Sequence, residues 1–420
     1  MSEIESSSYR AYRYRWIILI LYIFIAMVTQ IYWLTFSPIN NLVANTMGVP
    51  NEWIVQMTAT FMYAYIPVNF VASYLIDKLG LKWGVGVGVI LTGVFGFLRA
   101  LNSTNFWWVC AMQIGIAIGQ PFILNASVKL AGEWFKEDEK AMATGLGTMA
   151  QFLGSIIGFI VSPIIIENFI AETSPGIFEI TKQGMDLLLY IYGGIGLGIA
   201  TLYLIFVKNK PPTPPNRYAE KTKVMMWSGV KKLFKTKDFV ILTVCIFIAL
   251  GAFNAMSSLI DGIFEDQLPI GDTSTAGLIA GVLIIGGIIG AIILPAISDK
   301  VKKRKIFLII AFLSAVPLLI LLDYFTNIPL LFALSGVTGF LLISSLPIGL
   351  TYGAEITHPV PEETSTGVLM LSGQISGILF ILIPPQYVMY AMSGLFLIAA
   401  ILTFFTKDID HYKLEATVES

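Results

Sequence analysis

Residues 77–82 of the chain read DKLGLK, and residues 299–304 read DKVKKR. Each hexapeptide joins two long apolar tracts. An Asp followed by lysines is common at a membrane edge, but here the same kind of loop occurs twice, and the spacing from Asp77 to Asp299 defines what we call the repeat offset. This recurrence predicts two halves with one shared topology, parallel repeats related by an axis along the membrane normal.

The rest of the chain is a series of such apolar tracts. Charged residues make up 13% of the sequence, against roughly a quarter in soluble domains. Stretches without Asp, Glu, Lys or Arg cover 17–51, 53–76, 83–98, 100–128, 141–166, 187–207, 239–260, 273–298, 306–322, 324–354 and 364–406. A crossing needs about 20 apolar residues, and Pro384-Pro385-Gln386 divides the last tract into two. We predict an all-α membrane protein with twelve transmembrane helices in two pseudo-symmetric six-helix bundles.

Basic residues set the expected orientation. All 26 Lys and Arg residues except Arg99 and Lys182 fall at the termini or in loops of one side, and cytoplasmic loops retain Lys and Arg. Both termini are therefore expected in the cytoplasm, in a multi-pass protein of the plasma (inner) membrane. The predicted parts are a cytoplasmic N-terminus at 1–15, a six-helix bundle at 16–207, a basic linker at 208–238, a second six-helix bundle at 239–406 and a cytoplasmic tail at 407–420.

Two segments need a separate interpretation. The first apolar tract is too long for a signal-peptide core and lacks a small-residue cleavage pattern, so we expect it to be the first span. In the linker, apolar residues recur at helical spacing opposite lysines. This pattern is typical of a short amphipathic helix on the inner leaflet, with a plain solvated linker as the alternative.

Two glutamines stand out, because polar side chains at mid-membrane are rare and usually face a cavity. Gln151 lies halfway along the fifth predicted span, and Gln374 lies halfway along the eleventh, at nearly the same spacing as the repeat offset. These spans are equivalent in the repeat, so both amides are expected to contact one central ligand. The alternative is that each glutamine hydrogen-bonds a neighbouring helix.

A second pair consists of Trp33 in the first predicted span and Asn254 in the seventh. Trp33 follows Gln30 and Tyr32, and an indole in the cavity offers a π surface to a cation; the alternative is the outer aromatic belt. Asp261 lies roughly two turns beyond Asn254. It is expected to attract a cation or to carry a coupling proton; the alternative is that water solvates it in the vestibule. These five residues join the two glutamines as candidate substrate-binding residues.

Charged residues at the cytoplasmic helix ends are predicted to form gate salt bridges. Glu133 follows the fourth predicted span and Glu355 follows the tenth. With the two hexapeptides they complete the candidate gating set, which is Asp77, Lys82, Glu133, Asp299, Arg304 and Glu355.

Patterns of soluble catalysts are missing from the sequence. The two histidines, His358 and His411, have no spacing suited to a metal, and no phosphate-binding glycine-lysine loop occurs. We therefore expect no enzyme activity, no metal, no cofactor and no nucleic-acid partner. The expected partners are a small-molecule substrate and the lipid bilayer, and the chain is expected to be a monomer.

Residues 355–367, EITHPVPEETSTG, resemble the loop before the eleventh span in the FLVCR-related branch of the major facilitator superfamily, the haem and choline transporter family. Weaker similarity covers nearly the whole chain, including Tyr32-Trp33 and Gly251-Ala-Phe253. The long terminal extensions of the animal members are missing, so a compact prokaryotic member is expected.

This resemblance implies a transporter with rocker-switch alternating access for a small polar or cationic organic solute. It implies that Trp33, Gln151 and Gln374 belong to a choline site, whereas the family's tyrosine on the seventh span is Asn254 here. With one aromatic wall, a primary amine, a neutral polar metabolite and a choline-like cation compensated by Asp261 all stay open; a choline- or ethanolamine-like amine is favoured. The alternatives are a proton-coupled exporter of a larger lipophilic compound such as haem, and a non-transporting receptor or scaffold.

Overall fold

The computed structural model describes residues 12–213, 227–265, 267–269, 272–358, 360 and 362–407. The chain divides into two compact units, Met1–Val224 and Met225–Ser420. Residues 1–11 of the expected N-terminal segment, 214–226 of the expected linker and 408–420 of the expected tail lie outside the described residues.

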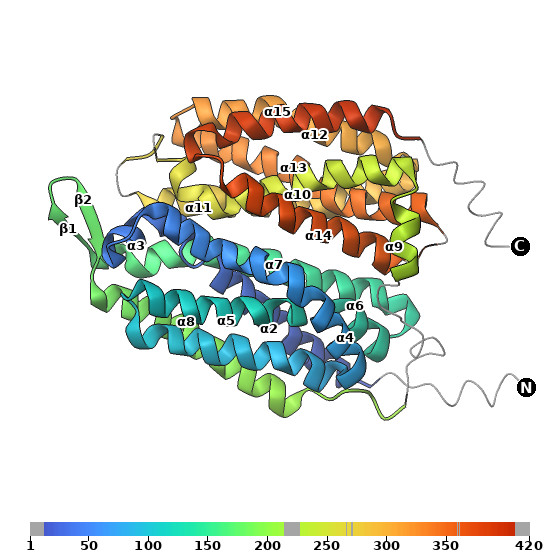
Figure 1. The fold of residues 1–420 in the computed structure, drawn as a ribbon, viewed down its shortest axis with the longest axis horizontal. Coiled ribbons are helices and arrows are strands. Elements are labelled where there is room, and N and C mark those ends of the chain that lie inside the picture. Colours follow the sequence, from blue (N-terminus) through green and yellow to red (C-terminus); the bar gives the residue numbers. More distant parts are fainter. Residues whose placement is uncertain are drawn as a thin grey trace, which may run out of the picture. The chain divides into compact units, whose positions relative to one another are not determined.

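The first unit consists of long helices and one hairpin (Figure 1). Its helices are α2 (Arg15–Leu34), α3 (Asn40–Met47), α4 (Asn51–Leu98), α5 (Phe106–Leu124), α6 (Ala126–Trp134), α7 (Glu137–Ile166) and α8 (Lys182–Phe206). Short 3-10 helices occur at η1 (Ser37–Ile39), η2 (Arg99–Asn102) and η3 (Glu167–Phe169).

In the part of the second unit that the structure describes, the regular secondary structure is helix. It contains α9 (Trp227–Leu233), α10 (Lys237–Ile263), α11 (Thr273–Val301), α12 (Arg304–Tyr324), α13 (Ile328–Thr357), α14 (Glu362–Ile381) and α15 (Pro385–Phe404). The start of α15 at Pro385 agrees with the predicted division of the last apolar tract.

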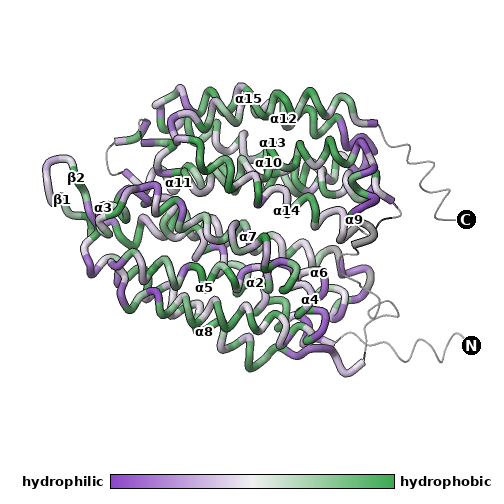
Figure 2. The backbone as a smooth tube through the Cα atoms, viewed as in Figure 1, coloured by the Kyte–Doolittle hydropathy of each residue, from purple (hydrophilic) through white to green (hydrophobic). Residues whose placement is uncertain are grey.

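Eleven helices among the described residues are long and apolar enough to cross a membrane. Hydrophobic residues cover them along most of their length, and hydrophilic residues gather at the helix ends and in the loops (Figure 2). Large apolar side chains such as Ile292 and Leu313 are about half exposed on the helix surfaces. A surface of this kind is suited to lipid.

The longest of these helical segments, Asn51–Asn102, has 52 residues and would extend about 80 Å if straight. Gly80 interrupts it with φ 77° and ψ −175°. A Cβ on Gly84 would lie 2.6 Å from the Cα of Ile76, so the chain turns back on itself here. Helix α4 therefore makes two crossings, and the fold with twelve transmembrane helices is confirmed.

The matching turn of the second unit lies between α11 and α12. Lys302, which corresponds to Gly80 by the repeat offset, has φ 54° and ψ 35°. Both turns thus use one residue with positive φ at the same position of the repeat. Glycine adopts such a conformation freely, whereas a residue with a Cβ does so at a cost.

A hairpin in the first unit was not predicted from the sequence. Strand β1 (Ile170–Ser174) pairs antiparallel with β2 (Ile177–Ile180). The Asn45 amide of α3 donates to the Phe178 carbonyl over 2.9 Å, and the Ile180 N–H donates to Thr46 Oγ1 over 2.7 Å. These hydrogen bonds join helix α3 to the hairpin at the end of the first span.

Candidate functional site

In the first unit, two of the candidate binding residues lie on helices that pack closely together. Trp33 is on α2 and Gln151 is on α7. A Cβ on Gly154, one turn after Gln151, would lie 2.7 Å from the Cα of Met27 on α2, so these helices approach through a glycine contact. The glycine pattern that the sequence shows next to Gln151 has this packing role.

The side-chain polar atoms of Trp33 and Gln151 form no hydrogen bonds with other described residues. Trp33 is buried, and its indole Nε1 has no hydrogen-bond partner among the described residues. Gln151 is half-buried. Its backbone carbonyl accepts from Ser155 Oγ over 3.1 Å, while its amide forms no hydrogen bond within the described part of the chain.

The second unit repeats this arrangement on α10 and α14. A Cβ on Gly373 would lie 2.6 Å from the Cβ of Leu250, so these helices also approach through glycine. Asn254 Nδ2 donates to the Gly373 carbonyl over 3.2 Å. Gln374 is the next residue, is half-buried, and makes no side-chain hydrogen bond with the described residues.

Tyr32 has a different place from the one expected. Its ring is fully buried inside the first unit, where a Cβ on Gly96 or Gly196 would clash with it. Its hydroxyl donates to the Tyr192 carbonyl over 2.9 Å. The ring fills a glycine-lined notch between helices, so we assign Tyr32 to packing and remove it from the substrate contacts.

The two remaining candidates are buried polar residues within single units. Gln30 lies one turn before Trp33 on α2, and Asp261 lies in the last turn of α10. Their assignment to substrate binding stays a prediction.

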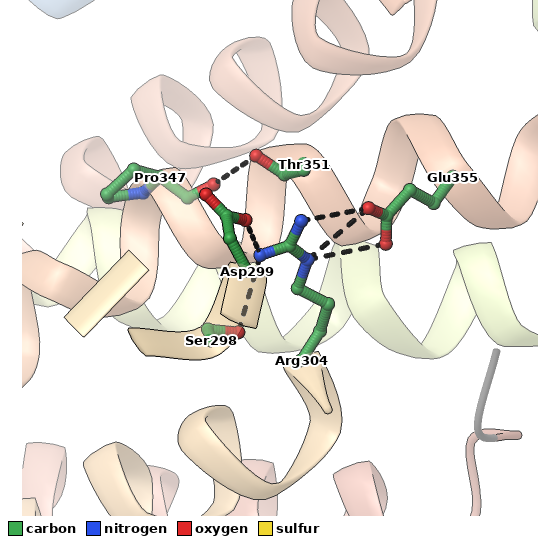
Figure 3. A network of polar contacts seen from close by, with 6 residues as sticks. All are labelled: Ser298, Asp299, Arg304, Pro347, Thr351 and Glu355. Carbon is green, nitrogen blue, oxygen red and sulfur yellow. Dashed lines mark hydrogen bonds and ion pairs between the residues drawn. The ribbon is translucent and has the colours of Figure 1, made fainter. Parts of the chain in front are cut away.

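The gating residues of the second unit come together in one cluster, which we name the Arg304 cluster (Figure 3). The Arg304 guanidinium pairs with Asp299 through Nη1 and with Glu355 through Nη2, 3.0 Å from Oε1. Nε adds contacts of 3.3 and 3.4 Å to the Glu355 carboxylate. The Arg304 side chain is 9% exposed, that of Glu355 20% and that of Asp299 60%. The cluster thus joins α11, α12 and α13.

The first unit has a matching group, which we name the Lys129 cluster. Lys129 Nζ lies 3.1 Å from Asp77 Oδ1 and 4.0 Å from Glu133 Oε1, and it donates to the Ile76 carbonyl over 2.8 Å. Glu133 Oε2 has no partner among the described residues. The cluster joins α4 and α6.

Lys82 is not part of this cluster, contrary to expectation. Its backbone N–H donates to Asn209 Oδ1 over 2.7 Å, and its Nζ lies 5.6 Å from the centroid of the Trp83 ring. Sequence reasoning missed Lys129 as the pairing residue. The available signal was its position four residues before Glu133 on a helix.

A polar chain in the first unit was also missed. Asn125, between α5 and α6, accepts from the Tyr65 hydroxyl over 3.2 Å and donates to Asn69 Oδ1 over 2.6 Å and to Ser73 Oγ over 3.2 Å. Tyr65, Asn69 and Ser73 share one face of α4 because they are four residues apart. They connect the break in the fourth span to the helix face that carries Asp77.

The chemistry of the candidate binding residues is that of recognition. Amides donate and accept hydrogen bonds without changing charge, and an indole face attracts cations. Groups of three or more His, Cys, Asp or Glu side chains that could hold a metal ion do not occur among the described residues.

Comparisons with known proteins identify the family to which the chain is similar. The family model of the Major Facilitator Superfamily matches residues 18–381. An uncharacterized MFS-type transporter of Caenorhabditis elegans is 29% identical over 90% of this chain, which spans 65% of that protein. The choline/ethanolamine transporter flvcr2a of Danio rerio is 27% identical over 91% of this chain and 82% of its own length.

A solved structure shows the same fold. The crystal structure of a bacterial homolog to the human lysosomal transporter Spinster, inward-facing and unoccupied, has a TM-score of 0.72 at 14% identity. The superposition covers 94% of this chain and 98% of that one. At this identity the likeness concerns the fold alone.

Proposed function

Because the chain belongs to the Major Facilitator Superfamily, as an FLVCR-related transporter, we propose that it carries a small polar or cationic organic solute across the membrane. A choline- or ethanolamine-like amine is the favoured substrate. The relative from Danio rerio that is named a choline/ethanolamine transporter supports this class of substrate.

One observation carries the proposal. Gln151 and Gln374 lie halfway along equivalent spans, within one residue of the repeat offset. Both are half-buried, and neither amide bonds to another described residue. A glutamine that serves only to join helices would have its amide bonded to a neighbour, as Asn254 does. Each unit thus keeps one amide available to a ligand, and Trp33 adds an aromatic surface for a cation.

The mechanism we propose is rocker-switch alternating access, with both termini in the cytoplasm and the chain in the plasma (inner) membrane. The asymmetry of basic residues supports this orientation. The Arg304 cluster joins three helices of one unit and the Lys129 cluster joins two helices of the other. In this mechanism they stiffen each unit, so that it moves as a body.

The test is ligand binding by purified protein followed by uptake into proteoliposomes, with choline, ethanolamine and haem as probes. Gln151→Ala and Gln374→Ala are each expected to raise the Kd of the bound amine about tenfold, because each removes about one ligand hydrogen bond. Gln183→Ala, at an exposed position of α8, is the matched control and is expected to bind as the wild type does. Unchanged affinity in both glutamine variants would contradict the proposal.

A further inference from the structure

Arg99, one of the two exceptions to the charge asymmetry, is buried in the first unit. It begins η2 directly after α4, and its exposed fraction is 0%. No carboxylate forms an ion pair with it among the described residues. A buried cation inside a membrane protein is expensive and commonly has a function.

The neighbours of Arg99 come from α5 and from the end of the first span. Nη1 donates to Gln113 Oε1 over 2.6 Å, and Nη2 donates to Thr35 Oγ1 over 3.3 Å. The guanidinium carbon lies 5.0 Å from the centroid of the Tyr32 ring and 5.2 Å from that of Phe36. Two aromatic faces and two neutral acceptors thus stabilise the charge in place of a carboxylate.

These contacts meet where the first span is interrupted. Helix α2 ends at Leu34, and the chain continues through η1 into α3. A helix end leaves carbonyls without partners and carries a partial negative charge. Gln113 Nε2 donates to the Tyr32 carbonyl over 3.1 Å, and Thr35 Oγ1 donates to the Ile31 carbonyl over 2.7 Å. Arg99 donates to Gln113 through that amide's other polar atom, Oε1, and to Thr35 through the same Oγ1 that donates to Ile31. Its charge lies beside this helix end.

The second unit lacks this arrangement. Its equivalent helix, α10, runs without interruption from Lys237 to Ile263. By the repeat offset, Leu321 stands in place of Arg99 and Ser335 in place of Gln113. The buried cation therefore accompanies the interruption of the first span and is not a general requirement of the repeat.

Trp33 lies in the last turn of α2, between Tyr32 and Leu34. Its ring is buried and its indole N–H has no partner within the described residues. No hydrogen bond therefore fixes the ring, and its place depends on packing and on the backbone that carries it. That backbone is held at Tyr32, through its carbonyl by Gln113 and through its ring by Arg99.

We propose that Arg99 is a positioning residue, which fixes the interrupted end of α2 through Gln113, Thr35 and Tyr32 and thereby holds Trp33 in place as the aromatic wall of the substrate site. The last step rests on the proposed function. Arg99 itself does not contact the substrate.

The first measurement is hydrogen exchange by mass spectrometry on the purified full chain. Arg99→Met removes the charge and both donors, and it is expected to speed exchange in residues 31–47 while residues 244–260 of α10 stay unchanged. Arg99→Lys keeps the charge without the planar fork and is expected to have an intermediate effect. Lys182→Met is the matched control, because Lys182 is exposed and pairs with Asp186. Unchanged exchange in 31–47 would overturn the proposal.

The second measurement is a double-mutant cycle on choline binding. Arg99→Met alone is expected to raise the Kd about tenfold, the size expected when one favourable contact is lost. In a Trp33→Ala background it is expected to change the Kd no further, because the residue it positions is gone. Additive effects of the two changes would show a general loss of structure and would overturn the positioning role.

If Arg99→Met does not fold, Gln113→Leu cuts the bond to the Tyr32 carbonyl and has the same expected results. If the wild-type chain binds neither choline nor ethanolamine, the proposed function fails by itself. The exchange measurement then still supports or overturns the hold of Arg99 on the end of α2.

Discussion

The Arg304 cluster and the Lys129 cluster occupy equivalent places in the two units, but their cations have different origins. In each unit a Glu follows the hexapeptide Asp at the same spacing, as in Asp77 to Glu133 and Asp299 to Glu355. The cation of the second unit comes from the hexapeptide, and that of the first comes from α6. Each unit thus has a positive charge between two carboxylates, and a different helix supplies it in each.

The residues that correspond under the repeat offset show that the cation has changed position between the units. Under it, Arg304 corresponds to Lys82 and Lys129 corresponds to Thr351. Lys82 forms no ion pair among the described residues, and Thr351 donates its hydroxyl to the Pro347 carbonyl over 3.0 Å. A planar guanidinium bonds both carboxylates through several N–H groups, whereas an ammonium is a point charge. We therefore expect the Arg304 cluster to contribute more stability.

The largest effect is expected for Arg304→Ala, at about 3 kcal/mol of lost unfolding free energy, because it leaves the largely buried Glu355 carboxylate without its cation. Lys129→Ala is expected to cost less, about 2 kcal/mol, because Lys129 Nζ is 4.0 Å from the largely buried Glu133 carboxylate and 3.1 Å from the more exposed Asp77. Thermal unfolding of the purified variants measures both, with the exposed Lys303→Ala as a control in the same loop. Equal losses at the two positions would break the distinction between the clusters.

A smaller effect, in the opposite direction, is expected when Thr351→Lys is added to Arg304→Ala. The new ammonium stands at the position that Lys129 occupies in the first unit, so about 1.5 kcal/mol of the loss is expected to return. Ser372→Lys, in the same background, places a lysine near the middle of α14 and is expected to lower stability further, because a charge inside a span is costly. If Thr351→Lys fails to raise the unfolding temperature, the two clusters are not interchangeable.

The smallest effect concerns the two turns. Lys302 has the left-handed conformation at the position where the first unit has Gly80, and this conformation costs a residue with a Cβ about 1 kcal/mol. Lys302→Gly is therefore expected to raise the unfolding free energy by about that amount, as read from the unfolding temperature. Lys303→Gly is the control, since φ is −130° there, and it is expected to bring no gain. A loss of stability in Lys302→Gly would show that the side chain matters more than the backbone conformation.

The fourth span shows a further difference between the units. Asn125 separates α5 from α6 and bonds to three polar residues of α4. In the second unit the equivalent position is Pro347, inside the unbroken helix α13. By the repeat offset, Gly287, Ala291 and Pro295 replace the polar residues of α4. The polar contact between the fourth span and α4 therefore belongs to the unit whose fourth span is interrupted.

Much of the fold could be predicted because hydropathy reports it directly. The length of an apolar tract decides whether it crosses a bilayer, and prolines mark where a long tract divides. The hairpin at Ile170–Ile180 was missed because its residues lie outside the apolar tracts. The double crossing within α4 was predicted from the charges of the hexapeptide, although the structure places Gly80 itself at the turn.

The candidate site was only partly predictable. The placement of Gln151 and Gln374 follows from depth in the membrane and from the repeat, and neither amide bonds to another described residue. Tyr32 was misplaced because its depth is the same whether it faces a cavity or a notch between helices. Lys82 was misplaced because the repeat alone suggested that it copies Arg304.

The sequence by itself determined the twelve crossings, the division into two repeats and their common offset, because apolar length and residue spacing are properties of the chain alone. The tertiary structure decided which cation joins the Asp77 and Glu133 carboxylates, which face of α2 Tyr32 occupies, and how Arg99 is buried without a carboxylate. These outcomes depend on contacts between residues that are distant in the chain. Such contacts form only when the helices pack, and hydropathy carries no information about which helix faces meet.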